Sequence, residues 1–250
     1  MNASHDHSTL HEAHTPEAIR RRMSLRPDRG YLPDAVLGGI DGGVTTFAIA
    51  AGAFGAGLPG TVVVVLGAAN LLADGFSMAA SNYLSVKSER EEVERERRRE
   101  ESHVARVPDG EREEIRQIFA GKGFSGELLE RIVAVITADR RVWVDTMLTE
   151  EHGLSLVGRN PLRAALATFA AFLLVGLLPV LPFVIAPSNS AGAFGASIVV
   201  TAAAFAGVGM LKGRVLHRAL LWSGFETLLI GSLAAVLAYG VGHVLRQLYA

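Results

Sequence analysis

Five long apolar stretches alternate with polar segments along the chain. They cover residues 34–58, 61–83, 162–185, 192–211 and 220–245. Each stretch is close to the roughly 20 residues that a helix needs to cross the hydrocarbon core of a bilayer. The pattern therefore predicts an all-α membrane protein with five transmembrane helices.

The second apolar stretch continues into a strongly polar segment without a break. Residues 76–107 contain neither glycine nor proline, so we expect one continuous helix from residue 61 to residue 107. At about 1.5 Å per residue this helix is about 70 Å long, roughly twice the thickness of a bilayer core. Its second half is therefore expected to lie in water.

A polar module separates the second apolar stretch from the third. Its pattern predicts three short helices, over residues 111–120, 126–137 and 139–152. The chain then divides into four parts. These are a flexible N-terminal tail (1–30), transmembrane helices 1 and 2 (31–86), a helical module inserted between helices 2 and 3 (87–153), and transmembrane helices 3 to 5 (160–250).

Composition agrees with this division. Half of the 250 residues are hydrophobic and the mean hydropathy is +0.31, which is unusual for a soluble domain. The absence of cysteine excludes disulfides, cysteine-based zinc sites and thiol catalysis. No extended basic and aromatic surface supports nucleic-acid binding. The first 30 residues lack the apolar core of a signal peptide, so we expect the first transmembrane helix to direct insertion.

The basic residues predict an orientation. The arginine-rich tail, the module and the loop at residues 212–218 carry nearly all of the lysines and arginines, and five spans place these three segments on one side. Because basic segments stay in the cytoplasm, we expect the N-terminus and the module there and the C-terminus outside. Arg, Ala and Gly richness, without organelle-targeting features, favours a bacterial plasma membrane.

Acidic side chains inside the apolar stretches are the first candidates for chemistry, because placing them in lipid is costly. Asp34 and Asp41 are seven residues apart on one helical face, with Asp41 about 10 Å deeper. We interpret Asp41 as a cation-binding residue of a transport path. Asp74 either lines that path or hydrogen-bonds between helices. Glu226 either exchanges protons or is a structural hydrogen-bond partner.

The polar module holds possible metal ligands at helical spacing. These are Glu100 with His103, Glu111 with Glu114, and Met147 with Glu151. Carboxylates combined with an imidazole and a thioether suit Fe²⁺, Mn²⁺ or Zn²⁺ better than Ca²⁺ or Mg²⁺. Four histidines in the tail either belong to a plain polar segment or capture metal weakly. They are His5, His7, His11 and His14.

Two motifs resemble those of the vacuolar iron transporter (VIT) family. One is Asp41-Gly42-Gly43-Val44-Thr45-Thr46 in the first apolar stretch, and the other, more specific one is the segment 77–88, which leads into the charged helix. The resemblance covers residues 31–248. It implies a homodimer with the transport path at the dimer interface, and glycines such as Gly38 and Gly42 would permit close helix approach.

The resemblance also implies an activity and a set of ligands. Members of the family are thought to move Fe²⁺ out of the cytoplasm in exchange for protons, without a prosthetic group. Asp41 and Met78 match the positions that bind metal within the membrane. The residues that match the cytoplasmic metal-binding module are Glu100, Glu111, Glu114, Met147 and Glu151.

Three positions depart from the family pattern. His103 stands where a glutamate is usual, and imidazole shifts the preference toward later transition metals. Leu148 stands where a second methionine can occur. Asn82 replaces a glutamate of the second-helix motif, which puts the selectivity of the path and any proton step in doubt there, although Asp74 partly replaces that carboxylate.

These residues predict two separate metal sites and a transport cycle. Glu100 lies about 33 Å beyond Met78 along a straight helix, so one ion cannot contact both. We expect the module to capture Fe²⁺, Mn²⁺ or Zn²⁺ and to pass it to Asp41 and Met78, with release outside coupled to proton entry. No G-x-S-x-G or Walker-type motif supports a membrane enzyme. A metal sensor or accessory protein that binds without conducting stays open as an alternative.

Overall fold

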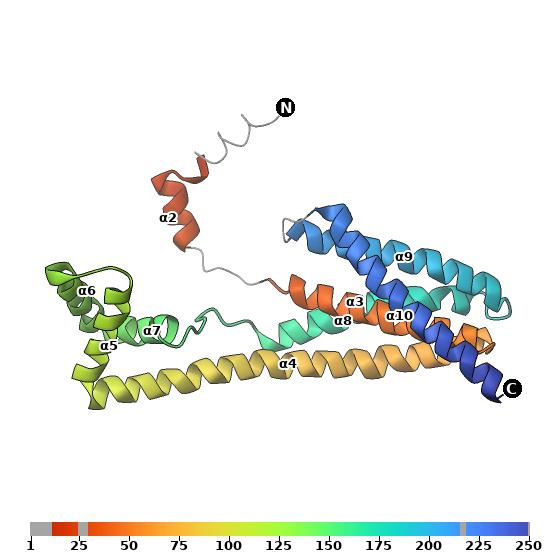
Figure 1. The fold of residues 1–250 in the computed structure, drawn as a ribbon, viewed down its shortest axis with the longest axis horizontal. Coiled ribbons are helices and arrows are strands. Elements are labelled where there is room, and N and C mark those ends of the chain that lie inside the picture. Colours follow the sequence, from red (N-terminus) through yellow and green to blue (C-terminus); the bar gives the residue numbers. More distant parts are fainter. Residues whose placement is uncertain (1–11, 25–29, 216–218, 250) are drawn as a thin grey trace. The chain divides into compact units, whose positions relative to one another are not determined.

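A computed structural model of the chain describes residues 12–24, 30–215 and 219–249, and all regular secondary structure in these ranges is helical. In chain order the helices are α2 (Pro16–Ser24), α3 (Leu32–Gly55), α4 (Gly60–Arg106), α5 (Pro108–Gly121), α6 (Gly126–Ala138), α7 (Arg140–Glu150), α8 (Pro161–Ile185), α9 (Ser190–Val215) and α10 (Leu220–Tyr249). Figure 1 shows their arrangement.

Five of these helices, α3, α4, α8, α9 and α10, are long and apolar enough to cross a membrane. They confirm the five spans that the apolar stretches predict. Helix α4 has 47 residues and continues from the apolar into the polar sequence without interruption. It ends at the residue before Val107, and α5 begins immediately at Pro108 because proline is compatible with the first turn of a helix.

The chain divides into two compact units, and α4 takes part in both. We call the first the apolar unit; it comprises residues 30–90 and the chain from Asn160 onward. The second contains the polar module, residues 91–159, together with the N-terminal segment.

Helices α3 and α8 approach each other closely within the apolar unit (Figure 1). A Cβ atom on Gly38 would collide with the backbone oxygen of Thr168, and one on Gly42 with that of Phe172. These two glycines are therefore used for helix packing inside one chain. The sequence left open whether these glycines serve close helix approach in a dimer. The contact between α3 and α8 within one chain is sufficient to explain them.

The polar module has its own small core. Apolar side chains of α5, α6 and α7 meet there, namely Ile115, Leu129, Val133, Trp143 and Met147. Asp139 caps α7 by accepting hydrogen bonds from the backbone amides of Arg141 (2.8 Å) and Val142 (3.2 Å). An ion pair of 2.6 Å between Arg97 and Asp145 joins α7 to the polar end of α4.

Helix α2 lies within the part of the chain that the sequence predicts to be a flexible tail. Pro16 occupies its first turn, and the Thr15 hydroxyl accepts a hydrogen bond from the backbone amide of Ala18 at 3.3 Å. His14 lies just before this helix, whereas His5, His7 and His11 lie outside the described residues.

Candidate metal centre

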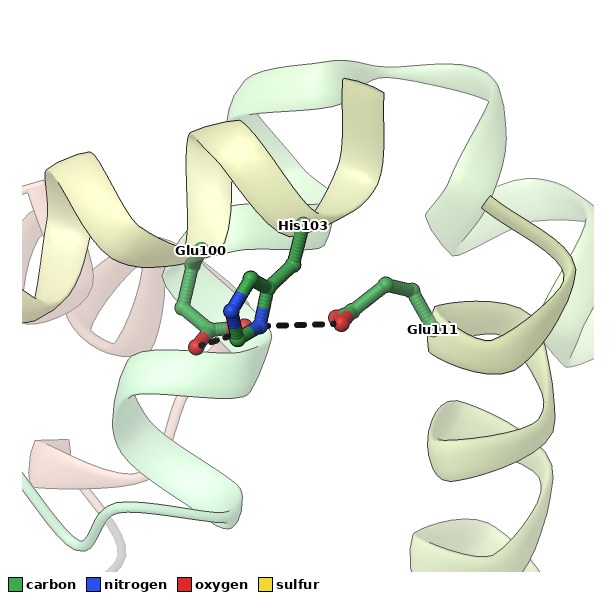
Figure 2. A group of neighbouring side chains, drawn as sticks. All are labelled: Glu100, His103 and Glu111. Atoms are coloured by element: carbon green, nitrogen blue, oxygen red, sulfur yellow. Dashed lines mark ion pairs between the residues drawn. The ribbon is translucent and has the colours of Figure 1, made fainter. Parts of the chain in front are cut away.

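The polar end of α4 and the first turn of α5 bring Glu100, His103 and Glu111 together (Figure 2). Glu100 and His103 are one turn apart on α4, and the change of direction at Val107 places Glu111 opposite them. The His103 Nδ1 atom lies 3.3 Å from Glu111 Oε1 and 3.8 Å from Glu100 Oε1. Each of the three residues offers one possible metal-ligand atom, and these three atoms all lie within 4.8 Å of one another.

The carboxyl end of α7 contributes a second set around the same Glu100. His152 Nε2 lies 3.1 Å from Glu100 Oε1 and 3.7 Å from Glu151 Oε2. The backbone amides of Glu151 and His152 both donate to the Met147 carbonyl, at 3.0 and 3.2 Å. Gly153 then takes a positive φ of 65°, a conformation typical of a residue that follows a helix.

Glu100 and Glu111 are buried more deeply than glutamates usually are. Their exposed fractions are 2% and 3%, and among the described residues neither Glu100 Oε2 nor Glu111 Oε2 has a hydrogen-bond partner. A buried carboxylate oxygen without a partner is costly, because it loses its hydration and gains nothing in return. A bound cation would supply the missing interaction.

The crowding of carboxylates changes how these groups bind protons. Burial, the charges of Glu114 and Glu100 and a hydrogen bond with Glu100 raise the pKa of the Glu111 carboxyl to about 7. Burial likewise raises the pKa of Glu151, which the charges of Glu114 and Glu100 reinforce and that of His152 opposes. Near neutral pH, protons therefore compete with any cation for this cluster.

The same carboxylates also change the pKa of the His152 imidazole. Burial alone would lower the pKa of its imidazole, but the hydrogen bond with Glu100 and the charges of Glu151, Glu100 and Glu96 outweigh burial and raise that pKa. The negative potential that favours a protonated imidazole also favours a divalent cation at the same place.

Two residues predicted as ligands, Glu114 and Met147, are not part of the two groups of possible ligands around Glu100. Glu114 is exposed on the outer side of α5 and acts on Glu111 through its charge. Met147 is fully buried and packs with Ile115 and Trp143 in the core of the module. The Leu148 side chain is fully buried as well, so apolar packing accounts for both neighbours.

In the apolar unit, acidic and amide groups line a groove between α3 and α4. The groove has a volume of about 660 Å³, and its polar lining residues are Asn70, Asp74 and Ser77. Asp41 is half-buried on α3 and close enough to Asp74 for their charges to interact. Met78 lies one turn beyond Asp74 on α4 and is also half-buried.

Hydrogen bonds link α3, near Asp41, to α4. Asn70 donates to the hydroxyls of Thr45 (3.2 Å) and Thr46 (3.4 Å), and Thr45 donates to the Asp41 carbonyl at 2.9 Å. The backbone around Asp41 is thus tied to α4. In the motif of residues 41–46, the two threonines therefore have a structural role, in addition to the acidic side chain of Asp41.

Asn82 and Glu226 have defined partners. The Asn82 amide donates to Asp34 Oδ1 at 2.9 Å and to the Thr168 hydroxyl at 2.8 Å, so it joins α3, α4 and α8. Glu226 forms a 3.3 Å ion pair with Lys212 of α9. This contact fits the structural alternative for Glu226 that the sequence left open.

Comparison with known proteins decides the family. Residues 32–243 match the model of the VIT family. The chain belongs to this family. It is 33% identical to vacuolar iron transporter 2 of Oryza sativa subsp. japonica over 216 residues, which are 86% of this chain and 87% of the relative. It is 34% identical to the vacuolar iron transporter of Toxoplasma gondii, covering 86% of this chain and 74% of the relative, and 32% identical to vacuolar iron transporter 1 of Arabidopsis thaliana, covering 86% of both.

Membership of the VIT family confirms the resemblance drawn from the two motifs and identifies the chain as an integral membrane protein of a transporter family. Of the residues predicted for the module, the structure brings together Glu100, His103, Glu111 and Glu151.

The sequence interpretation missed His152 as a neighbour of Glu100. The only local signal for it is that His152 follows Glu151 directly and precedes a glycine.

Proposed function

We propose that this VIT-family chain exports Fe²⁺ or Mn²⁺ from the cytoplasm in exchange for protons. The observation that carries the proposal is the Glu100 carboxylate, which is almost fully buried, retains an unpartnered oxygen and has two imidazoles and a second buried glutamate beside it. A cation would give the unpartnered oxygen of this buried carboxylate the interaction that it lacks. The centre then collects metal from solution for a path through the apolar unit.

The apolar unit supplies a second group of ligands for that path. Asp41 and Asp74 place two interacting negative charges beside a groove with amide and hydroxyl groups, and Met78 adds a thioether nearby on α4. Because acidic groups within spanning helices are costly, their placement beside a groove whose lining includes Asn70, Asp74 and Ser77 supports a role in ion passage. We propose that two copies of the chain enclose this groove, which is open on the single chain.

A flux assay in proteoliposomes tests this function directly. The purified chain is reconstituted with a metal-sensitive dye and a pH-sensitive dye inside, and Fe²⁺, Mn²⁺ or Zn²⁺ is added outside. We expect metal entry above that of protein-free vesicles, with a matching pH change caused by counterflow of protons. Metal binding without any flux would instead establish the non-conducting accessory protein.

Substitution of Asp41 separates the path from the collecting centre. Asp41→Asn keeps the size of the side chain, removes its charge and is expected to abolish flux while metal binding by the purified protein is retained. The matched control is Asp109→Asn, which removes an exposed carboxylate of α5. Full flux in Asp41→Asn would end the assignment of Asp41 to the path.

A further inference from the structure

His152 is held against the metal centre by the backbone around it. Its ring lies just beyond the last turn of α7, where two amides converge on the Met147 carbonyl and Gly153 reverses the chain. The ring is 22% exposed, and its Nε2 atom is 3.1 Å from Glu100 Oε1. The backbone at the end of α7 is therefore well defined, and it places the His152 ring beside Glu100.

The contact with Glu100 is more than an isolated ion pair. Glu100 is shared by two sets of three residues, Glu100 with His103 and Glu111, and Glu100 with Glu151 and His152. Each set offers one imidazole nitrogen and two carboxylate oxygens within 4.8 Å of one another. Oε1 of Glu100 faces both imidazoles, yet Oε2 has no partner among the described residues. The second oxygen is available to a cation.

The charges around His152 point the same way. Glu100, Glu111 and Glu151 face the two imidazoles, so carboxylates outnumber histidines even if both rings carry a proton. Glu96, on the preceding turn of α4, is engaged by Arg95 at 2.9 Å and by Arg99 at 3.5 Å. The groups left to hold a cation are therefore the three carboxylates and the two imidazoles.

Ligand chemistry then distinguishes among cations. Imidazole nitrogen is a favourable ligand for Zn²⁺ and other later transition metals, whereas an all-carboxylate set favours Mn²⁺ and harder ions. With His103 and His152 both beside Glu100 Oε1, the centre offers two nitrogen ligands in addition to its carboxylates.

We propose that His152 is a metal ligand of the centre and that, together with His103, it raises the affinity of the centre for Zn²⁺ and the other later transition metals relative to Mn²⁺. The inference rests on the proposed metal-collecting role and specifies which cation class the collector takes. It assigns His152 a direct contact with the cation, through Nε2, beside the shared Glu100.

The test compares metal binding by the full-length chain and its His152→Gln variant in detergent. Affinities for Zn²⁺ and Mn²⁺ are measured by competition with a chromophoric chelator. We expect the variant to lose at least about tenfold in Zn²⁺ affinity, since loss of a ligand costs no less than loss of its supporting residue. The affinity for Mn²⁺ should change much less, so the ratio of the two affinities falls. The matched control, His243→Gln, replaces an exposed histidine of α10 and should leave both affinities unchanged.

A second variant and a spectroscopic measurement keep the test decisive. His152→Asp should shift the preference toward Mn²⁺, because it exchanges nitrogen for a carboxylate oxygen. X-ray absorption at the Zn²⁺ edge, with less than one equivalent of metal, should show fewer imidazole scatterers in His152→Gln than in the unaltered chain. An equal loss of both metals, or an unchanged imidazole count, would overturn the inference and assign His152 a structural role.

The outcome is distinguishable from a failure of the proposed function. If the unaltered chain binds neither Zn²⁺ nor Mn²⁺, the collecting centre itself is refuted. If it binds both with a ratio that His152→Gln leaves unchanged, only the role of His152 is refuted.

Discussion

At the scale of single residues, the centre depends on carboxylates held where they are hard to ionise. Glu111 is 3% exposed and lies opposite Glu100, and burial with the charges of Glu114 and Glu100 raises its pKa to about 7. A cation needs the deprotonated carboxylate as a ligand. Metal binding must therefore displace a proton from Glu111 whenever the pH is below or near 7.

This proton can be counted. As pH falls from 8 to 6, the Glu111 carboxyl passes from mostly deprotonated to mostly protonated, so the affinity of the full chain for metal is expected to fall. In Glu111→Gln the affinity should be lower throughout, and binding should release about half a proton fewer at pH 7, because a carboxyl with a pKa of about 7 is half protonated there. Calorimetry in two buffers of different ionisation enthalpy measures this number.

The control for Glu111 is Asp109→Asn, since the Asp109 side chain is 96% exposed and paired with Arg112. It should leave the proton count unaltered. If Glu111→Gln released as many protons as the unaltered chain, Glu111 would not be the group that titrates, and the charge at the centre would have to reside on the other glutamates or the imidazoles.

At the scale of elements, the contact between α3 and α8 requires glycine where the helices cross. A Cβ atom at Gly42 would meet backbone atoms of Phe172, which cannot move aside as a flexible side chain can. We expect Gly42→Ala to destabilise the apolar unit by about 1–3 kcal/mol, the usual cost of overpacking. The midpoint of thermal unfolding in detergent, followed by fluorescence-detected gel filtration, measures this loss.

Gly240→Ala provides the comparison, because nothing lies within 4 Å of a Cβ atom at Gly240 of α10. This variant should unfold at or slightly above the temperature of the unaltered chain, since alanine favours helices more than glycine does. Equal midpoints for Gly42→Ala and Gly240→Ala would show that α3 and α8 do not approach as closely as described.

The same elements show which features a sequence can predict. The five spans follow from length and apolarity alone, because a bilayer admits few other structures. The continuity of α4 follows from the absence of glycine and proline over residues 76–107. By contrast, Gly38 and Gly42 indicate close packing without naming the helix that approaches, and only the structure identifies it as α8.

Some residues of the metal centre can likewise be predicted from the sequence, and others cannot. Glu100 and His103 share a helical face and could be paired from their spacing. Glu111 joins them only because the chain changes direction at Val107, and His152 joins them from the end of α7, which is far away in the sequence. Met147 is predicted from its spacing to Glu151 and from the family resemblance, but its side chain lies in the apolar core, where packing with Ile115 and Trp143 accounts for it.

At the scale of the whole molecule, one helix joins the two units of the chain. Helix α4 belongs to the apolar unit up to Arg90 and to the unit of the polar module from Glu91. No glycine or proline interrupts it over residues 76–107, so this connection is one continuous helix. The chain also passes between the units at residues 29/30 and 159/160, and the segment 151–160 has no helix.

The orientation of this assembly in the membrane can be tested with single cysteines, since the chain has none of its own. We predict that Glu127→Cys, on an exposed position of α6, reacts with a membrane-impermeant maleimide only after cells are permeabilised, because basic segments keep the polar module in the cytoplasm. Ser188→Cys, exposed between α8 and α9, should react in intact cells. Each position serves as the control for the other, since both must react after permeabilisation. Labelling of Glu127→Cys in intact cells would place the collecting centre outside, and metal captured there could only be imported.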